Sequence, residues 1–232
     1  MSKLIYTGKT KDVFDNADGT YTLKLKDDAT GKDGVFDPGE NAVGLSIAGL
    51  GLVSLRLSSY YFELLQAAGI PTHYLGSDFT EATMRVLPGQ MFGKGVEFIC
   101  RRRADGSFVR RYGAYITAGT VLDYLVEVTL KDDTRGDPPI IKDALCRLGI
   151  MSEADYERCK TLTQDITKII AEDLHKKGLE LYDIKFEFGK HQGEIILVDE
   201  VSAGSMRAYK DGIWLQPMDL ARYILGDGMQ NA

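Results

Sequence analysis

Charged side chains gather around two β-like runs in the last part of this sequence. In the first run, Leu181–Phe188, apolar residues alternate with three charged ones, Asp183, Lys185 and Glu187. A strand with that period carries its charges on one face. The second run, Glu194–Asp199, is apolar at its centre and ends in two adjacent carboxylates. Carboxylates and a lysine in such a place suit a magnesium ion and the phosphates that it bridges.

This pattern alone leaves two points open. An antiparallel hairpin with an ordinary charged outer face explains it equally well. The register of the hairpin also matters. A five-residue loop over Gly189–Gly193 places Asp199 opposite Asp183 on the charged face, whereas a four-residue loop moves it to the other face.

Two lysines near the N-terminus offer a second place for phosphate. Residues 3–30 show β-prone alternation around a turn at Asn16–Gly19, which predicts a small antiparallel hairpin. Within it, Gly8 is followed by Lys9 and Lys11, which a strand would direct to the same side. The pattern is not the phosphate-binding loop GxxxxGK[ST]. Two solvated surface lysines explain the spacing more simply.

The stretch over residues 100–115, CRRRADGSFVRRYGAY, holds five arginines within eleven residues. Such a cluster could contact nucleic acid, but a strand period directs Arg101 and Arg103 to one face and Arg102 to the other. We expect Gly106 and Ser107 to form a turn whose backbone amides and hydroxyl cradle a phosphate that an arginine neutralises. A solvated turn with exposed arginines explains the same residues.

The remaining helices, strands and loops are predicted from the period of the apolar residues and from the positions of glycine and proline. Residues 31–51 are rich in glycine and predict a long loop. Residues 130–139 predict a charged loop that Asp-Pro-Pro closes. Ser152 and Asp155 resemble a capping box at the start of the clearest helix, whose apolar stripe faces the core. Helices are expected at residues 52–68, 152–177 and 217–226, the last of which carries Arg222, and further strands at residues 80–86 and 96–102.

Length and composition exclude several classes of protein. The chain has 232 residues, enough for a full core in one large domain or two lobes, and a net charge of −6. That charge argues against nonspecific nucleic-acid binding. The three cysteines, Cys100, Cys146 and Cys159, have no metal-binding spacing and predict free thiols in a reducing compartment. We expect a cytoplasmic protein, because the sequence shows neither an apolar signal segment nor a membrane span.

Six motifs in this order resemble the SAICAR synthetase family, over about two hundred residues. The first three are GKTKDVF at Gly8–Phe14, KDDATGKDG at Lys26–Gly34 and VEFICRRRADGS at Val96–Ser107. The other three are LKDDTRGDP at Leu130–Pro138, DIKFEFG at Asp183–Gly189 and DEVSAGSMR at Asp199–Arg207. Members of this family join carboxyaminoimidazole ribotide to aspartate at the expense of ATP in purine biosynthesis.

The resemblance implies an α+β fold with two lobes. An N-terminal antiparallel sheet lobe with one helix would span residues 1–86, and a larger lobe similar to ATP-grasp enzymes would span residues 87–232. The nucleotide and the substrates would bind between the lobes. The resemblance further implies ATP and Mg²⁺ as cofactors, a phosphorylated ribotide and an amino acid as substrates, and a homo-oligomer, most simply a dimer, with no nucleic acid or membrane as partner.

The resemblance also assigns roles to particular residues. The phosphates of ATP would contact Lys9 and Lys11, and Mg²⁺ would be held by Glu187 and Asp199. Catalysis would involve Lys185, with Asp183 as its support. The ribotide would be bound by Arg101, Ser107 and Arg207, with Asp137 beside its base and ribose and Arg222 as a further candidate.

Two departures from the family pattern leave the substrate open. Residues 50–55, LGLVSL, stand where the family has K-G-x-x-N-N, and Ala203-Gly204 stands where it has Pro-Asp. Apolar residues in place of hydrogen-bonding ones change which substrate a site accepts. Three hypotheses therefore remain: a SAICAR synthetase, a paralogous ligase of specialised nucleoside metabolism for a related heteroaryl carboxylate or another amine, and a catalytically silent binding protein.

Overall fold

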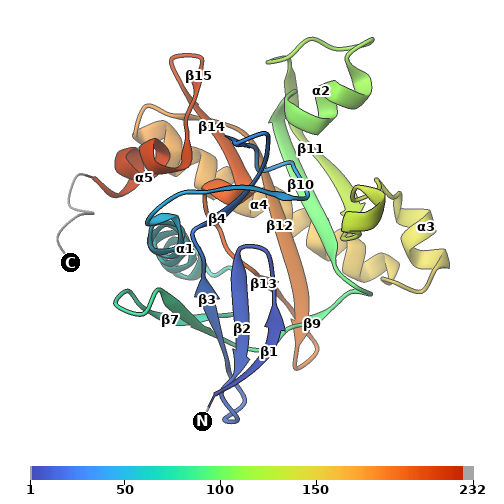
Figure 1. The fold of residues 1–232 in the computed structure, drawn as a ribbon. Helices are drawn as coiled ribbons and strands as arrows, with labels where there is room; N and C mark the ends of the chain where they lie inside the picture. Colours follow the sequence, from blue (N-terminus) through green and yellow to red (C-terminus); the bar gives the residue numbers. More distant parts are fainter. Residues whose placement is uncertain (1, 227–232) are drawn as a thin grey trace.

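The predicted N-terminal hairpin forms one edge of a five-stranded antiparallel sheet, in a computed structural model that describes residues 2–226 (Figure 1). The strand order is β1-β2-β3-β8-β7. Its strands are β1 (Lys3–Thr7), β2 (Lys11–Asp15), β3 (Tyr21–Leu25), β7 (Tyr74–Asp78) and β8 (Thr83–Val86). Between β1 and β2, the Gly8 amide donates to the Lys11 carbonyl at 2.8 Å. A Cβ atom on Gly8 would lie 2.8 Å from that same oxygen, so this tight turn requires glycine.

A seven-stranded antiparallel sheet carries the charged runs of the sequence. Its main order is β11-β10-β12-β14-β15, and both β9 and β13 also pair with β12. Its strands are β9 (Gln90–Met91), β10 (Val96–Arg103), β11 (Val121–Leu130), β12 (Glu180–His191), β13 (Glu194–Val198), β14 (Met206–Lys210) and β15 (Ile213–Trp214). The alternation along β12 is confirmed, because Ile184, Phe186 and Phe188 are buried in the main core. The charged residues therefore lie on the opposite face.

One long helix covers the apolar face of this sheet, as Figure 1 shows behind β10 and β12. This helix, α4 (Glu153–Lys176), is the one that the sequence predicts most clearly. The Ser152 side chain caps it by accepting from the Asp155 amide at 3.1 Å. Its buried stripe includes Ile166 and Ile170, as the helical period predicts.

The other helices place loops of the site or join the two sheets. Helix α1 (Leu50–Ala67) packs on β3 and β7 and also on α5 (Pro217–Leu225). Two short helices are α2 (Gly106–Tyr112) and α3 (Lys142–Arg147), and two 3-10 turns are η1 (Asp133–Arg135) and η2 (Ala203–Ser205). The main hydrophobic core includes residues of both large sheets, and a second, smaller cluster contains Ala29, Phe36 and Leu50.

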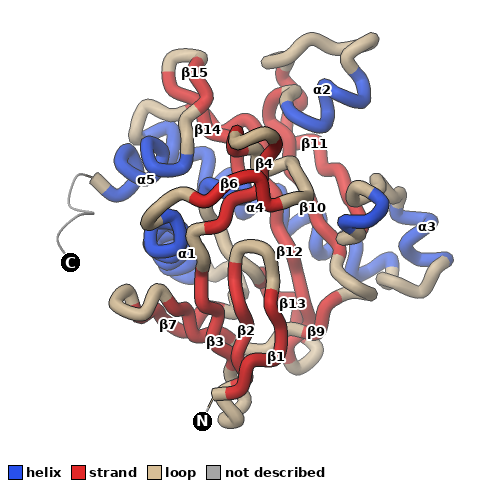
Figure 2. Tube along the Cα trace, in the orientation of Figure 1, coloured by secondary structure: helices blue, strands red, loops and turns tan. Residues whose placement is uncertain are grey.

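Residues 31–51 are not the long loop that their glycines predict. They contribute to a small three-stranded sheet of order β5-β4-β6, formed by β4 (Asp28–Lys32), β5 (Val35–Phe36) and β6 (Val43–Ser46) (Figure 2). A Cβ atom on Gly44 would lie 2.4 Å from the backbone of Gly31, so the glycines allow two backbones to approach closely. Phe36 stacks on Trp214 of β15, with ring centroids 5.9 Å apart. This contact fixes the small sheet over the charged face of the large one.

The predicted α+β fold with two lobes is confirmed, whereas the division at residue 86 stays a prediction. All three cysteines are free thiols. Among the described residues, no helix is both long enough and apolar enough to cross a membrane.

Candidate active site

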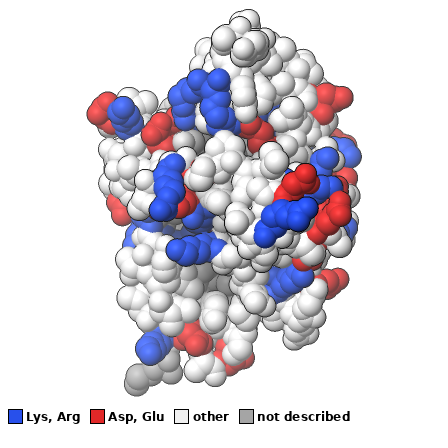
Figure 3. Space-filling model, turned by 90° about the vertical axis from the view of Figure 1, so that its right-hand side faces the viewer, with Lys and Arg blue, Asp and Glu red and all other residues white. Residues whose placement is uncertain are grey.

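A cavity of about 450 Å³ lies between the β1–β2 turn, the small sheet and the charged face of the seven-stranded sheet. Figure 3 shows basic side chains around a hollow on one face of the molecule. The predicted site residues that line the cavity are Lys9, Lys11, Arg101, Ser107, Asp137, Asp183, Lys185, Glu187, Asp199 and Arg207. Arg222 does not line it: this exposed side chain lies on α5 and pairs with Asp219 at 3.2 Å.

Lys11 and Asp199 join the N-terminal lobe to the large sheet. Lys11 opens β2, and its Nζ pairs with the Asp199 carboxylate and, at 3.0 Å, with Glu200 Oε2. Burial acts to lower the pKa of Lys11, but the two carboxylates outweigh it and raise that pKa. Burial also acts to raise the pKa of Asp199, but Lys11 and then Lys131 outweigh it and hold that pKa well below its ordinary value. Both groups are therefore charged at neutral pH.

Neither of the two registers considered for the β12–β13 hairpin is correct. His191 pairs with Glu194 and Glu187 pairs with Val198, so the loop is the two-residue turn Gln192-Gly193, and Asp199 does not lie opposite Asp183. Asp199 follows the last residue of β13 with a φ of 70°. This left-handed conformation, which aspartate tolerates better than most residues, ends the strand alternation and turns the side chain into the cavity.

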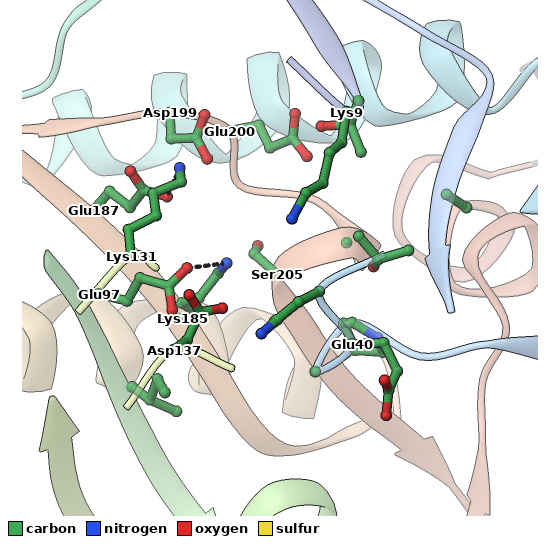
Figure 4. A pocket seen from close by; sticks show the side chains of 18 of the residues that line it. Lys9, Glu40, Glu97, Lys131, Asp137, Lys185, Glu187, Asp199, Glu200 and Ser205 are labelled. Atoms are coloured by element: carbon green, nitrogen blue, oxygen red, sulfur yellow. Dashed lines mark hydrogen bonds and ion pairs between the residues drawn. The ribbon is translucent and has the colours of Figure 1, made fainter. Parts of the chain in front are cut away.

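Glu187 is the second buried carboxylate on this side of the cavity (Figure 4). It is 3% exposed and pairs with Lys131 Nζ at 2.6 Å. Burial, and next the charge of Asp199, raise the pKa of Glu187 above its ordinary value, although Lys131 and Lys185 act in the opposite direction. The charge of Asp199 therefore acts on Glu187, and both carboxylates line the same cavity.

Glu97 and Lys131 are site residues that the reasoning from residue types missed. Lys185 Nζ pairs with Glu97 Oε1 at 2.7 Å, and Thr129 Oγ1 donates to Glu97 Oε2 at 2.8 Å. The register of β10 with β12 places Glu97 directly beside Glu187. Each missed residue lies inside one of the six motifs, so the resemblance held a signal for them. Residue type alone gave no such signal, because Glu97 is a lone glutamate in an apolar strand and Lys131 is one of several charged residues in a loop.

Two buried arginines form the other end of the cavity, and both contact Asp183. Arg101 is 1% exposed; its Nη1 donates to Asp183 Oδ2 at 2.8 Å and its Nη2 donates to Ser107 Oγ at 2.9 Å. Arg207 Nη1 donates to the same Asp183 oxygen at 3.1 Å. Burial acts to lower the pKa of Arg207, but Asp183 and Asp37 outweigh it and raise that pKa. This end therefore holds fixed positive charge.

Gly106 and Ser107 begin helix α2 and do not form the predicted turn. The Asp105 side chain caps this helix by accepting from the Gly106 amide at 2.7 Å. Gly106 has a φ of 50°, and a Cβ atom there would lie 2.6 Å from Arg207 Cζ. Glycine is therefore required both by the backbone and by the close approach of the guanidinium.

The small sheet brings a carboxylate to the same arginine. Asp37 Oδ1 accepts from Arg207 Nη2 at 2.5 Å, and Asp37 Oδ2 accepts from Arg110 Nη1 at 3.3 Å. Burial acts to raise the pKa of Asp37, but the Gly39 amide and Arg207 outweigh it, so that pKa is lowered. The cavity is closed on this side by charge pairing between the small sheet and α2.

The loop between β11 and α3 forms a third wall. Lys9 Nζ pairs with Asp133 at 2.6 Å across the mouth of the cavity. Asp137 Oδ1 accepts from the Asp132 amide at 2.7 Å, and burial raises the pKa of Asp137 above its ordinary value. The predicted charged loop is thus confirmed, and it contains the short η1 turn.

The donor set fits a magnesium ion that is held together with phosphates. Among the described residues, no three acidic, histidine or cysteine side chains converge to hold an ion by themselves. Glu187 and Asp199 nevertheless face one cavity that five lysines also line. Magnesium in nucleotide sites is typically bound by one or two carboxylates, with phosphates and water supplying the other ligands. Two carboxylates beside several lysines match this pattern.

Fold and site together define an enzyme that handles anionic, phosphorylated substrates between two lobes. Comparison with known proteins then identifies the family: residues 4–217 match the SAICAR synthetase family profile. The chain is 56% identical to a phosphoribosylaminoimidazole-succinocarboxamide synthase of Clostridium tetani, over 96% of this chain and 99% of that protein. It is 36% identical to the synthase of Thermotoga maritima, over 97% of this chain and 93% of that protein. The chain belongs to the SAICAR synthetase family.

Solved structures agree with this membership. A SAICAR synthetase in complex with ADP superimposes with a TM-score of 0.84 at 27% identity, over 96% of this chain and 97% of that chain. A second SAICAR synthetase superimposes with a TM-score of 0.79 at 33% identity, over 97% and 93%. The predicted family is therefore confirmed.

Proposed function

We propose that this chain is an ATP-dependent ligase that joins carboxyaminoimidazole ribotide to L-aspartate through an amide bond. The observation that carries the proposal is one cavity with two chemically distinct ends. Carboxylates and lysines at one end suit a metal-bound triphosphate, and buried arginines at the other end suit a phosphorylated substrate. Identity of 56% over nearly the whole chain does not favour the paralogous ligase.

The nucleotide end is assigned from its charges and from the relative that binds ADP. Lys9 and Lys11 would contact the phosphates, because both come from the glycine turn at the mouth of the cavity. Glu187 and Asp199 would hold Mg²⁺, which would offset negative charge during phosphoryl transfer. Lys185 lies next to this pair and would stabilise the charge that develops on the transferred phosphoryl group.

The reaction needs an activated carboxylate. A carboxylate oxygen of the ribotide attacks the γ-phosphorus of ATP, ADP leaves, and an acyl phosphate forms. The amine of aspartate then attacks the acyl carbon, inorganic phosphate leaves, and the amine gives up a proton. No serine or cysteine nucleophile is required, so the protein contributes mainly position and electrostatic field.

The ribotide end would orient this carboxylate towards the nucleotide. Arg101, Ser107 and Arg207 would bind the ribotide phosphate, because two fixed guanidinium groups and a hydroxyl meet there. Asp183 would support this arrangement from β12, where it holds both guanidinium groups. Asp137 would lie beside the base and ribose. Arg222 is not assigned a role, because it lies outside the cavity.

Three further expectations from the sequence remain proposals. We place the enzyme in the cytoplasm, where a purine-pathway ligase finds its substrates. We expect it to act as a homodimer. We also propose that residues 1–86 and 87–232 form two lobes that bind the nucleotide between them.

The test is ADP release, measured with ribotide and aspartate present together and with each omitted in turn. We expect release only with the full set, formation of the amide product by mass spectrometry, and loss of release when EDTA removes divalent cations. Glu187→Gln and Asp199→Asn should both abolish release in folded protein. Glu172→Gln, on the exposed face of α4, serves as the matched control. ADP release with another carboxylate or amine only would support the paralogous ligase, and near-normal turnover in both site variants would remove the metal assignment.

A further inference from the structure

A buried histidine lies directly behind the nucleotide end of the cavity. His73 follows α1 in the segment 71–73, which runs beside the end of β13. The Leu197 amide donates to the Pro71 carbonyl at 2.9 Å, and the His73 amide donates to the Leu197 carbonyl at 2.9 Å. These two backbone bonds fix the position of the histidine relative to the strand that ends at Val198.

The imidazole of His73 is oriented by its packing and by one polar contact. His73 is 3% exposed, and its imidazole ring packs on Phe62 with ring centroids 5.3 Å apart. Nε2 lies 2.9 Å from the backbone carbonyl oxygen of Asp199. A carbonyl oxygen only accepts, so Nε2 carries the hydrogen in this contact and donates it.

The carbonyl that His73 holds belongs to the residue with the unusual backbone. Asp199 has a φ of 70° immediately after β13. In a continued strand, the side chain at this position would follow the alternation of β13 and would not turn towards Lys11. The orientation of the Asp199 peptide therefore decides whether its carboxylate reaches the cavity, and His73 binds that peptide from the core side.

We propose that His73 is a positioning residue for the metal-nucleotide site, and that its Nε2–H bond to the Asp199 carbonyl holds the Asp199 carboxylate in the cavity. The inference rests on the proposed role of Asp199 in holding Mg²⁺. Groups that orient a metal ligand in this way change metal affinity although they never touch the ion. The histidine differs from an ordinary core residue because its polar atom is aimed at the backbone of one site residue.

A set of three substitutions separates this role from simple packing. Glutamine at position 73 places an amide nitrogen at the ε position, where it can donate to the same carbonyl. Asparagine is equally polar but shorter, so its nitrogen lies near the place of Nδ1 and does not reach. Leucine fills the space without any donor. Thr72→Val is the matched control on the same segment, because it removes a buried hydroxyl that bonds with Gln66 and not with Asp199.

The experiment measures binding of ADP together with Mn²⁺ to the full chain, by calorimetry for the nucleotide and by electron paramagnetic resonance for the free ion. We expect His73→Leu and His73→Asn to weaken Mn²⁺·ADP binding by roughly ten- to a hundredfold. His73→Gln should remain close to the unchanged protein, and Thr72→Val should leave binding unchanged. In the assay of ADP release, the KM for the metal-nucleotide should rise in the two weak binders, whereas the KM for the ribotide should not.

Two outcomes would overturn the proposal. One is unchanged Mn²⁺·ADP binding in folded His73→Leu or His73→Asn. The other is equal weakening in His73→Gln and His73→Asn, which would show that packing and not the donor matters. If the leucine variant does not fold, the comparison between the glutamine and asparagine variants decides the question. Failure of the proposed function would look different, because the unchanged protein itself would then bind no metal-nucleotide.

Discussion

Replacing Asp183 by asparagine removes the charge that two buried arginines share. Asp183 is 2% exposed and accepts from Arg101 at 2.8 Å and from Arg207 at 3.1 Å. An asparagine keeps the shape, but its neutral amide cannot balance two guanidinium groups in a site of low dielectric constant. The variant should therefore fold less stably and hold its arginines less firmly.

The size of the effect follows from what remains around each arginine. Breaking a buried ion pair by removing one partner destabilises a protein by about 3–5 kcal/mol. Here Arg101 keeps Glu127 at 2.5 Å and Arg207 keeps Asp37 at 2.5 Å, so neither cation is left alone. The lower end, about 3 kcal/mol, is therefore expected. For a domain of this size, that loss lowers the Tm by about 6–12 °C.

The measurement compares the Tm of Asp183→Asn with the Tm of the control variant Glu180→Gln. Glu180 lies on the same strand as Asp183 and pairs with Arg103 of β10. Its side chain is 43% exposed, so its loss should lower the free energy of unfolding by at most about 1 kcal/mol. The KM for the ribotide should rise in Asp183→Asn and stay unchanged in the control. A Tm of Asp183→Asn that equals the Tm of Glu180→Gln would refute the reasoning, because burial would then have no influence on the pair.

Two further predictions concern the same cavity. Asp37→Asn should bind the ribotide about fivefold more tightly, as measured by calorimetry. The reason is that the partly exposed Asp37 carboxylate, whose ion pair with Arg207 is worth up to ~1 kcal/mol, no longer competes with the ribotide for that arginine. Weaker binding would instead place Asp37 among the groups that recognise the ribotide. Because the pKa of Glu187 is raised in the folded, ligand-free protein, the folded chain binds this proton more tightly than the unfolded chain at pH values between the ordinary pKa and the raised one. Stability from this group is therefore present below the ordinary pKa of glutamate, 4.5, and is lost as the pH rises through the raised value. In metal-free buffer, Glu187→Gln should flatten this part of the plot of Tm against pH, and an identical slope in both proteins would contradict the assignment.

Local signals predicted the three longest helices of the described residues, because the causes of these helices are local, whereas α2 and α3 were missed. The long helix Glu153–Lys176 has its cap, its apolar period and its terminal glycine within one stretch of chain. The same holds for α1 and α5, whose observed bounds differ from the expected ones by at most two residues at either end. In each case the residues that decide the structure are near neighbours in sequence.

Turns and loops were predicted wrongly at glycines that allow contacts with residues far along the chain. Gly189 predicted a turn, yet β12 continues through it, because a Cβ atom there would lie 3.2 Å from the backbone of Gly89. Gly31 and Gly44 predicted a loop, yet they allow β4 and β6 to pack closely. The sequence does not distinguish a glycine that forms a turn from a glycine that allows two backbones to approach closely. Only the pairing partner, which lies far along the chain, tells them apart.

Ten of the eleven predicted site residues line the cavity although the register was not predicted, because residue type and strand alternation are independent of pairing. The charged face of β12 is set by its own period, whichever strand lies beside it. The neighbours of those charges are set by pairing. Glu97 comes beside Glu187 only through the register of β10 with β12, so no local pattern could reveal it.

The pairing of charges in the cavity suggests how a highly charged site stays stable without its substrates. Lys11 pairs with Asp199, Lys131 with Glu187, and Lys185 with Glu97, so each carboxylate at the nucleotide end has a lysine partner. A buried charge without a partner is strongly destabilising. In the proposed function, Glu187 and Asp199 would hold the metal ion and the lysines would hold the phosphates. Each charge would then exchange one partner for another, and no buried charge would have to remain alone during binding.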